Sequence, residues 1–108
     1  MDELQFRTLR ELAKDWTLSQ RDLSRKLGLS LGRVNYLVNE LLKFGYLKAS
    51  RFKNSKHKIA YMYVLTPKGM SAKLAQTCHF LQRKLDEYHR LKDEIEALRQ
   101  ETDSLKEV

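Results

Sequence analysis

Hydrophobic residues in the first half of the chain recur at helical spacing, and a single glycine interrupts the pattern. Before the glycine, Leu23 and Leu27 stand four residues apart, and Ser19 precedes them as a residue type that favours helix N-caps. Gly28 is suited to end that helix, because glycine readily adopts the left-handed conformation of a C-cap. Ser30 can then cap a second helix. The pattern predicts two short helices joined by about three residues, the arrangement of a helix-turn-helix.

The second helix is expected to have one apolar and one polar face. Its apolar positions define an inward stripe: Val34, Leu37, Val38, Leu41 and Leu42. The outward positions near its N-terminus lack carboxylates and favour hydrogen bonding: Gly32, Arg33, Asn35, Tyr36 and Asn39. In a helix-turn-helix, the first turns of this helix present side chains to base edges. For the motif alone, an ordinary helical hairpin that never meets DNA is the alternative.

The segments on either side of this motif complete a small domain. An amphipathic helix is expected from about residue 2 to residue 14, and it would close a three-helix core. We expect Trp16 to serve as a core or edge anchor. The apolar positions of this amphipathic pattern are Leu4, Leu9, Leu12, Ala13 and Trp16.

After Gly45 the pattern changes from helical to extended. Residues 46–52 alternate, and residues 59–66 are rich in residues that favour strands. The polar connection between them, residues 53–58, holds three lysines and no acidic residue. We predict a hairpin whose basic tip lies along phosphates or in a minor groove, with an ordinary solvated turn as the alternative.

A last helix is predicted from Pro67 onward, with Thr66 as its cap. Its forty-two residues would extend roughly 60 Å, far beyond what a domain of this size can cover. Apolar residues recur along it at alternating steps of four and three, with one extra three-residue step after Tyr88. We expect this seam to pair with a second copy of the chain, in either parallel or antiparallel orientation. The expected dimerisation residues are Leu74, Cys78, Leu81, Leu85, Tyr88, Leu91, Ile95 and Leu98.

The predicted fold is therefore α+β and mainly α: a helix-turn-helix domain with a hairpin in residues 1–66, followed by a long dimerisation helix in residues 67–108. With 108 residues and 42% hydrophobic content, the chain can form one small core. Its net charge of +7 lies entirely in residues 1–66, and no acidic residue occurs between Glu40 and Asp86. Such one-sign clustering favours an anionic partner, with nucleic acid ahead of a membrane surface. No apolar run approaches the roughly 20 residues of a membrane span, and the one cysteine suits a reducing compartment, so we expect a soluble cytoplasmic protein.

This order of elements resembles the winged-helix domain of MarR-type regulators. The run L-S-Q-R-D-L-S-R-K-L-G-L-S-L-G-R-V-N-Y-L-V-N-E-L-L-K-F-G-Y-L-K, followed by Y-M-Y-V-L-T-P-K-G, is particularly similar to a short subgroup associated with exopolysaccharide (EPS) production. The resemblance implies a bacterial or archaeal DNA-binding regulator, usually dimeric, with a recognition helix that begins at Ser30 and a wing at residues 53–58. It places Leu31, Gly32, Arg33, Asn35 and Tyr36 at the base-facing positions of the family.

Two departures from the family pattern limit what the resemblance implies. The general MarR pattern prefers small polar residues and proline where this chain has Leu31, Gly32 and Arg33. Typical members are longer, with an extra N-terminal helix and paired C-terminal helices that enclose an effector pocket. Because this chain has a single long helix in their place, we do not expect a small-molecule effector.

Side-chain chemistry ranks the candidate DNA contacts. Arg33 is the first candidate to read a base, since a guanidinium can donate in bidentate fashion to guanine; Asn35 matches adenine, and Tyr36 suits a thymine methyl or a phosphate. Helix N-termini, hydroxyls and lysines suit the phosphate backbone. The expected backbone contacts are Ser19, Gln20, Arg21, Ser30, Lys53, Ser55, Lys56 and Lys58.

Enzymatic and metal-binding functions find no support in the sequence. His57, His79 and His89 lack metal-ligand spacing, and no glycine-rich phosphate loop is present, so neither cofactor nor metal is expected. Cys78 is interpreted as a small apolar residue of the seam. The competing hypothesis is a winged-helix adaptor whose wing and long helix bind a partner protein. The sequence leaves open the operator, the sense of regulation and the regulated genes.

Overall fold

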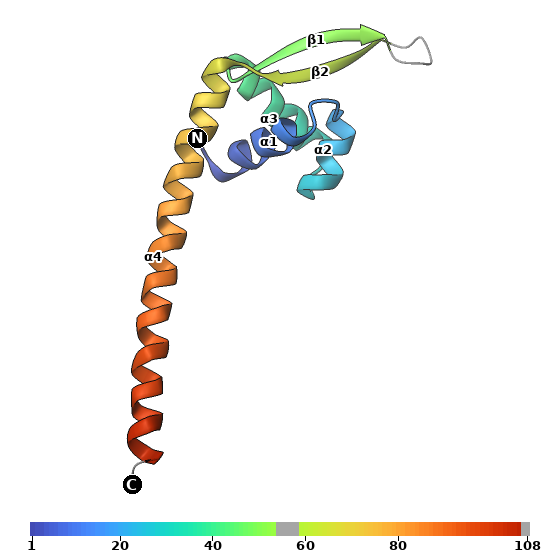
Figure 1. The fold of residues 1–108 in the computed structure, drawn as a ribbon. Coiled ribbons are helices and arrows are strands. Elements are labelled where there is room, and N and C mark those ends of the chain that lie inside the picture. Colours follow the sequence, from blue (N-terminus) through green and yellow to red (C-terminus); the bar gives the residue numbers. More distant parts are fainter. Residues whose placement is uncertain (54–58, 107–108) are drawn as a thin grey trace. The chain divides into compact units, whose positions relative to one another are not determined.

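The computed structural model describes residues 1–53 and 59–106. The chain forms two compact units, Met1–Gln76 and Thr77–Val108. The elements are three short helices, a two-stranded antiparallel sheet and one long helix (Figure 1). Their bounds are α1 Glu3–Lys14, α2 Gln20–Leu27, α3 Leu31–Lys43, β1 Leu47–Lys53, β2 Ile59–Leu65 and α4 Pro67–Lys106. The predicted class, a mainly helical winged helix-turn-helix with a long C-terminal helix, is confirmed.

The caps predicted for α2 and α3 are present. The Ser19 hydroxyl accepts from the backbone N–H of Asp22, and the Ser30 hydroxyl accepts from that of Arg33. Gly28 ends α2 with a φ of 66°, in the left-handed region that glycine tolerates at a C-cap. These local signals therefore fix both ends of the turn between the two helices.

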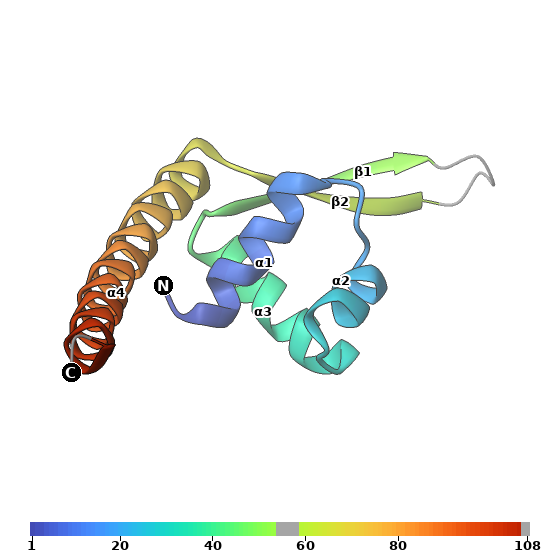
Figure 2. The ribbon, with the colours of Figure 1, turned by 60° about the horizontal axis from the view of Figure 1, so that its bottom comes forward.

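The core of the first unit lies between the three helices and the base of the hairpin. Figures 1 and 2 show α1, α2 and α3 gathered on one side of the hairpin formed by β1 and β2. Strand β2 packs against α1, and β1 packs against α3. The core cluster consists of Leu9, Leu12, Leu18, Leu23, Leu27, Val34, Val38, Leu41, Leu47 and Tyr63.

Of the two roles expected for Trp16, core or edge anchor, the structure contradicts the core role. Helix α1 ends at Lys14, so Trp16 lies in the turn beyond it and keeps 52% of its surface exposed. Phe6, which the predicted apolar pattern did not include, is buried on the inward face of α1 instead. Ala13, which the pattern did include, is exposed. The apolar stripe of α1 thus runs through Phe6, Leu9 and Leu12 and does not continue past the helix end.

The start of α4 is packed closely against the segment that follows α3. Thr66 caps α4 as predicted: its hydroxyl accepts from the Gly69 N–H at 3.0 Å, and its own N–H donates to the Tyr46 carbonyl at 3.0 Å. Gly69 is buried, and a Cβ atom placed on it would lie 2.1 Å from the Tyr46 oxygen. The approach of the two backbones therefore depends on the absence of a side chain at residue 69.

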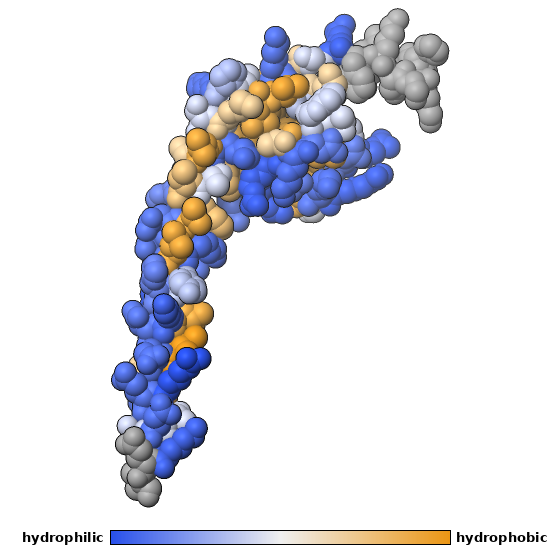
Figure 3. Space-filling model, in the orientation of Figure 1, coloured by the Kyte–Doolittle hydropathy of each residue, from blue (hydrophilic) through white to orange (hydrophobic). Residues whose placement is uncertain are grey.

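Helix α4 continues far beyond this packed start. Its 40 residues correspond to about 60 Å. Every described residue of the second unit, 77–106, is exposed, including the large apolar side chains Leu81, Leu91 and Leu98. Figure 3 shows apolar side chains as separate patches among polar ones along this helix. All eight predicted dimerisation residues are thus exposed in the part of the chain that the structure describes.

Candidate nucleic-acid interface

The N-terminal half of α3 is a polar surface held in place by an apolar one. Val34, Leu37 and Val38 are buried in the core, which fixes the rotation of the helix about its axis. All five predicted base-reading residues are exposed, and they lie within the first two turns of α3. They are Leu31, Gly32, Arg33, Asn35 and Tyr36.

Asn35 is part of a side-chain network that the sequence did not predict. The Asn39 amide donates to the Asn35 oxygen at 3.1 Å, and the Asn35 amide donates to the Gln20 oxygen at 3.2 Å. The Gln20 amide in turn donates to the Tyr63 hydroxyl at 2.9 Å. Because Tyr63 is buried in β2, the network ties α2 and α3 to the hairpin and holds the Asn35 carboxamide in one orientation. Gln20, predicted as a backbone contact, already uses both ends of its amide here.

Tyr36 is held by an acidic residue one turn farther along α3. Its hydroxyl donates to Glu40 Oε1 at 2.9 Å, and Gln5 of α1 donates to Glu40 Oε2 at 3.2 Å. The hydrogen bond to the Glu40 carboxylate, followed by its negative charge, raises the pKa of Tyr36 above its ordinary value. The phenol therefore uses its one donor within the helix, next to a carboxylate.

A shallow hollow lies between this part of α3 and the N-terminus of α1. Arg33, Tyr36 and Glu40 line it together with residues of the α1 end. Among the described residues, no hydrogen-bond or ion-pair partner is found for the Arg33 guanidinium, whereas Tyr36 is fixed. Arg33 is thus the cation on this surface whose donors are available to a ligand.

The N-terminus of α2 offers less to a ligand than the sequence indicates. Both the hydroxyl and the N–H of Ser19 are engaged with Asp22, at 3.1 and 3.0 Å. The hydrogen bond from the Ser19 N–H, followed by that with its hydroxyl, lowers the pKa of Asp22, so this carboxylate stays charged beside the helix N-terminus. Arg21 remains as an exposed cation on α2.

Basic and aromatic residues continue along the hairpin toward its tip. Lys48 and Arg51 of β1 are exposed, and the Arg51 guanidinium lies 5.7 Å from the ring centre of Tyr61, its cross-strand partner. This pair was not singled out from the sequence, although an aromatic residue among basic ones was the available signal. Lys53 belongs to β1, and its side chain is not described; Ser55, Lys56 and Lys58 lie outside the described residues.

In the part of the chain that the structure describes, no group of three or more His, Cys, Asp or Glu side chains is placed to hold a metal ion. No helix among those residues is long and apolar enough to cross a membrane.

Comparisons with known proteins show which family model and which solved structures this chain is similar to. A family model described as winged helix-turn-helix DNA-binding matches residues 1–48. A mutant of MepR from S. aureus matches with a TM-score of 0.72 at 20% identity, over 83% of this chain and 66% of that one. The zinc-responsive MarR family member ZitR from Lactococcus lactis gives 0.67 at 21%, over 87% and 62%. The S. aureus MepR–DNA complex gives 0.64 at 22%, over 78% and 60%. No curated protein matches the sequence significantly.

These matches establish the fold. At 20–22% identity the likeness to MepR and ZitR shows a shared winged-helix architecture. This chain spans 60–66% of the length of those proteins, less than two thirds. The sequence-based prediction of a MarR-type winged helix is confirmed at the level of the fold, because the structural neighbours are MarR-family regulators.

Proposed function

We propose that the protein is a sequence-specific double-stranded DNA-binding transcriptional regulator. The observation that carries the proposal is the exposed N-terminal face of α3, which offers Arg33 and Asn35 and is held rigidly by the core beneath it. A MarR-type neighbour of the same fold, S. aureus MepR, is known in complex with DNA. The absence of acidic residues between Glu40 and Asp86 supports the same reading, since phosphates repel carboxylates.

Arg33 and Asn35 are the base readers in this proposal. A free guanidinium can donate two parallel hydrogen bonds to guanine O6 and N7. Asn35 uses one amide hydrogen and one lone pair in its network, and an amide carries two of each. One donor and one acceptor therefore remain, which is the pair that adenine N7 and N6 require. Tyr36 would contact a thymine methyl with its ring, because its one hydroxyl hydrogen is donated to Glu40 and none remains for a phosphate.

The remaining predicted contacts go to the phosphate backbone. Arg21 on α2 and Lys48 on β1 are exposed cations on the same unit, and Ser30 stands at the N-terminus of α3, where an anion is favoured. The three lysines in residues 53–58 are added to these contacts on the basis of the sequence. The proposed backbone contacts are Arg21, Ser30, Lys48, Lys53, Ser55, Lys56 and Lys58. Ser19 and Gln20, also predicted from the sequence, already bond to other residues of this unit.

We further propose that residues 1–66 bind DNA and residues 67–108 join two copies of the chain. The exposed apolar side chains of α4 support this division, because a row of this kind is unusual on a monomer. A two-fold dimer would read an inverted repeat with half-sites about 34–36 Å apart or a multiple of that spacing. The resemblance to the EPS-associated subgroup supports exopolysaccharide genes as targets, without a small-molecule effector.

The decisive experiment compares binding of the full chain to the DNA upstream of its own gene and to random duplex at two salt concentrations. We expect the upstream DNA to bind at least about 10³-fold more tightly, with a steep decrease in affinity as salt rises. Weak and equal binding to both duplexes would remove the proposed function and favour the adaptor hypothesis.

Substitution of Arg33 tests the base-reading role directly. Arg33→Ala should cost about 1–3 kcal/mol on cognate DNA and relax specificity at one base pair. Arg90→Ala on α4 removes the same charge outside the proposed surface and serves as the matched control. Lys56→Ala should weaken all sequences alike and reduce the slope of log affinity against log salt by about one. Equal losses on cognate and random DNA for Arg33→Ala would exclude Arg33 as a base reader.

A further inference from the structure

The charged residues in the last three heptads of α4 follow a strict order. If Tyr88 is taken as position a of a heptad, the seam positions are Tyr88, Ile95 and Thr102 at a, and Leu91, Leu98 and Leu105 at d. The positions that flank the seam then separate by sign. Within residues 87–106, the g positions are acidic: Glu87, Glu94 and Glu101. All three e positions are basic: Lys92, Arg99 and Lys106.

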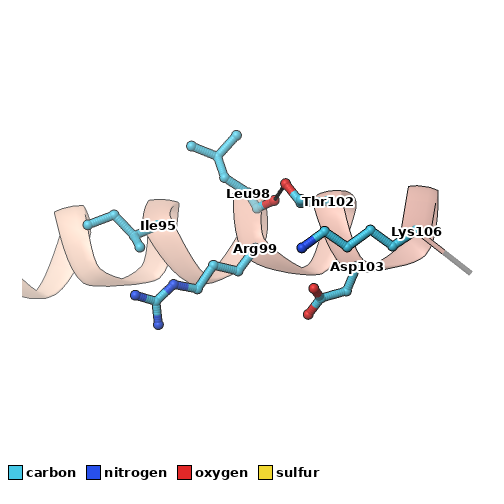
Figure 4. Close-up of a pocket in the computed structure, with 6 residues that line it drawn as sticks. All are labelled: Ile95, Leu98, Arg99, Thr102, Asp103 and Lys106. Carbon is cyan, nitrogen blue, oxygen red and sulfur yellow. Dashed lines mark hydrogen bonds between the residues drawn. The ribbon is translucent and has the colours of Figure 1, made fainter.

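The surface of α4 repeats with the same period. One shallow hollow is lined by Tyr88, Leu91, Lys92, Ile95, Glu96 and Arg99. A second is lined by Ile95, Leu98, Arg99, Thr102, Asp103 and Lys106, shown in Figure 4. Every lining residue of the second hollow stands seven positions after one of the first. Each hollow is lined by consecutive a, d and e side chains and by one b residue, Glu96 or Asp103. The a, d and e side chains are those that form the hole for a d side chain in a coiled coil.

The polar residue of the seam does not oppose burial. Thr102 is at an a position, and its hydroxyl donates to the Leu98 carbonyl of the same helix at 3.0 Å. Its hydrogen bond is therefore made within the helix, and its methyl group is available to the seam. Ile95 at a between Leu91 and Leu98 at d is the combination that favours two parallel strands.

The charge order distinguishes the two orientations of a pair. In a parallel pair, each g residue faces the e residue five positions later on the second copy, so Glu94 faces Arg99 and Glu101 faces Lys106. In an antiparallel pair, g faces g and e faces e, so acids would meet acids and bases would meet bases. Like charges held together are unfavourable, whereas every parallel contact is attractive.

We propose that residues 87–106 form a parallel, in-register two-stranded coiled coil with a second copy of this chain. The proposal rests on the homodimer of the proposed function and specifies its orientation. It also identifies Glu94, Arg99, Glu101 and Lys106 as the residues that select a like-oriented copy over an antiparallel one.

Disulfide trapping tests the register. In a Cys78→Ser background, Leu91→Cys and Leu98→Cys are made singly in the full chain and oxidised mildly. In a parallel pair each d residue faces its own counterpart, so both variants should cross-link, while Gln100→Cys at the outward f position should not. An antiparallel two-fold axis that brings residue 98 onto itself leaves the copies of residue 91 about 21 Å apart, too far for a disulfide. Cross-linking of one variant alone, or of neither, would overturn the proposal.

Charge reversal provides a second test that does not depend on cysteine chemistry. Glu94→Lys should weaken self-association roughly 5- to 30-fold at low salt, because two attractive contacts per dimer become repulsive. Arg99→Glu should act alike, and the double variant should restore the affinity. Asp93→Lys changes the charge equally at the outward f position and is the matched control. Tighter association of Glu94→Lys would indicate antiparallel pairing and refute the inference.

The two proposals can fail separately. Sedimentation equilibrium gives the oligomeric state of the unmodified chain, and DNA binding is measured on the same preparation. A dimer that fails both orientation tests removes the parallel arrangement but leaves a dimeric regulator. A monomer removes the coiled coil and the homodimer, and specific DNA binding is then judged by its own comparison with random duplex.

Discussion

The close approach of Gly69 to Tyr46 predicts a large effect of one methyl group. In Gly69→Ala, the new Cβ would lie 2.1 Å from the Tyr46 oxygen and 2.9 Å from its carbonyl carbon. Ordinary contacts are 3.4–4 Å, so the two backbones must separate by more than 1 Å. That movement also stretches the bond from the Thr66 N–H to the same oxygen, which is 3.0 Å long.

The change in the free energy of unfolding caused by Gly69→Ala is the sum of opposing contributions. Overpacking costs about 1–3 kcal/mol, and loss of a hydrogen bond adds about 0.5–1.5 kcal/mol. Alanine in place of glycine inside a helix returns about 0.5–1 kcal/mol. The net expectation is a destabilisation of about 1–3 kcal/mol, which lowers Tm by roughly 5–20 °C for a unit of this size.

Thermal and urea denaturation followed by far-ultraviolet circular dichroism measures this change. All samples should have the same protomer concentration, because dimerisation makes Tm depend on it. Gly32→Ala in α3 is the matched control: nothing lies within 4 Å of a Cβ there, so it should stabilise the chain by about 0.5–1 kcal/mol. If Gly69→Ala raises Tm as Gly32→Ala does, the close packing of α4 against Tyr46 is refuted.

Three further predictions concern the helix-turn-helix. Tyr63→Phe removes the acceptor of the Gln20 amide and should lower the free energy of unfolding, measured by urea denaturation, by about 0.5–1.5 kcal/mol. It should also weaken binding to cognate DNA more than binding to random DNA. Unchanged specificity would show that the network does not orient Asn35. Ser30→Ala should cost about 0.5–2 kcal/mol by the same measurement, while Ser30→Gly costs only a few tenths, so equal losses would argue against the cap. Because the pKa of Asp22 is lowered in the folded state, its carboxylate stabilises the fold fully above about pH 4, and this stabilisation is lost as pH falls through the folded-state pKa. In Asp22→Asn, the Tm should therefore depend less on pH in this acidic range. A pH profile of Tm equal to that of the unmodified chain would contradict the prediction.

Local features of the fold could be predicted from the sequence because their causes lie within one or two helical turns. Ser19, Gly28 and Ser30 act on their own neighbours, and the stripe of α3 follows from spacing alone. The same is true of Thr66 at the start of α4. At each of these positions, one residue type satisfies a backbone requirement that holds wherever the element packs.

The contacts that shape the candidate site could not be found in this way. Gln20 meets Tyr63, 43 positions away, and Gln5 meets Glu40, 35 positions away. No periodicity relates such residues, since their meeting depends on how the helices and hairpin pack. The bond from Tyr36 to Glu40 is the exception: it joins residues four apart on one helix, a spacing at which side chains meet.

Trp16 lies outside the core for a related reason. Its spacing after Leu12 fits the apolar stripe, but Asp15 ends α1 and binds Thr17 through its carboxylate, so the chain leaves the helical path before Trp16. A residue past a helix end no longer follows the phase of that helix. Aspartate and threonine are residue types that favour such turns, and they were the available signal.

The two parts of the chain use charge in opposite ways. Residues 1–66 carry the entire net charge of +7, which attracts DNA but makes two copies of this segment repel each other. Residues 67–108 carry equal numbers of acidic and basic side chains, so the segment proposed to join the copies adds no net repulsion. Its acids and bases are sorted to opposite flanks of the seam, where pairing with a like-oriented copy turns them into attractive contacts. DNA bound by two winged units would then neutralise the remaining repulsion, so that dimerisation and DNA binding strengthen each other.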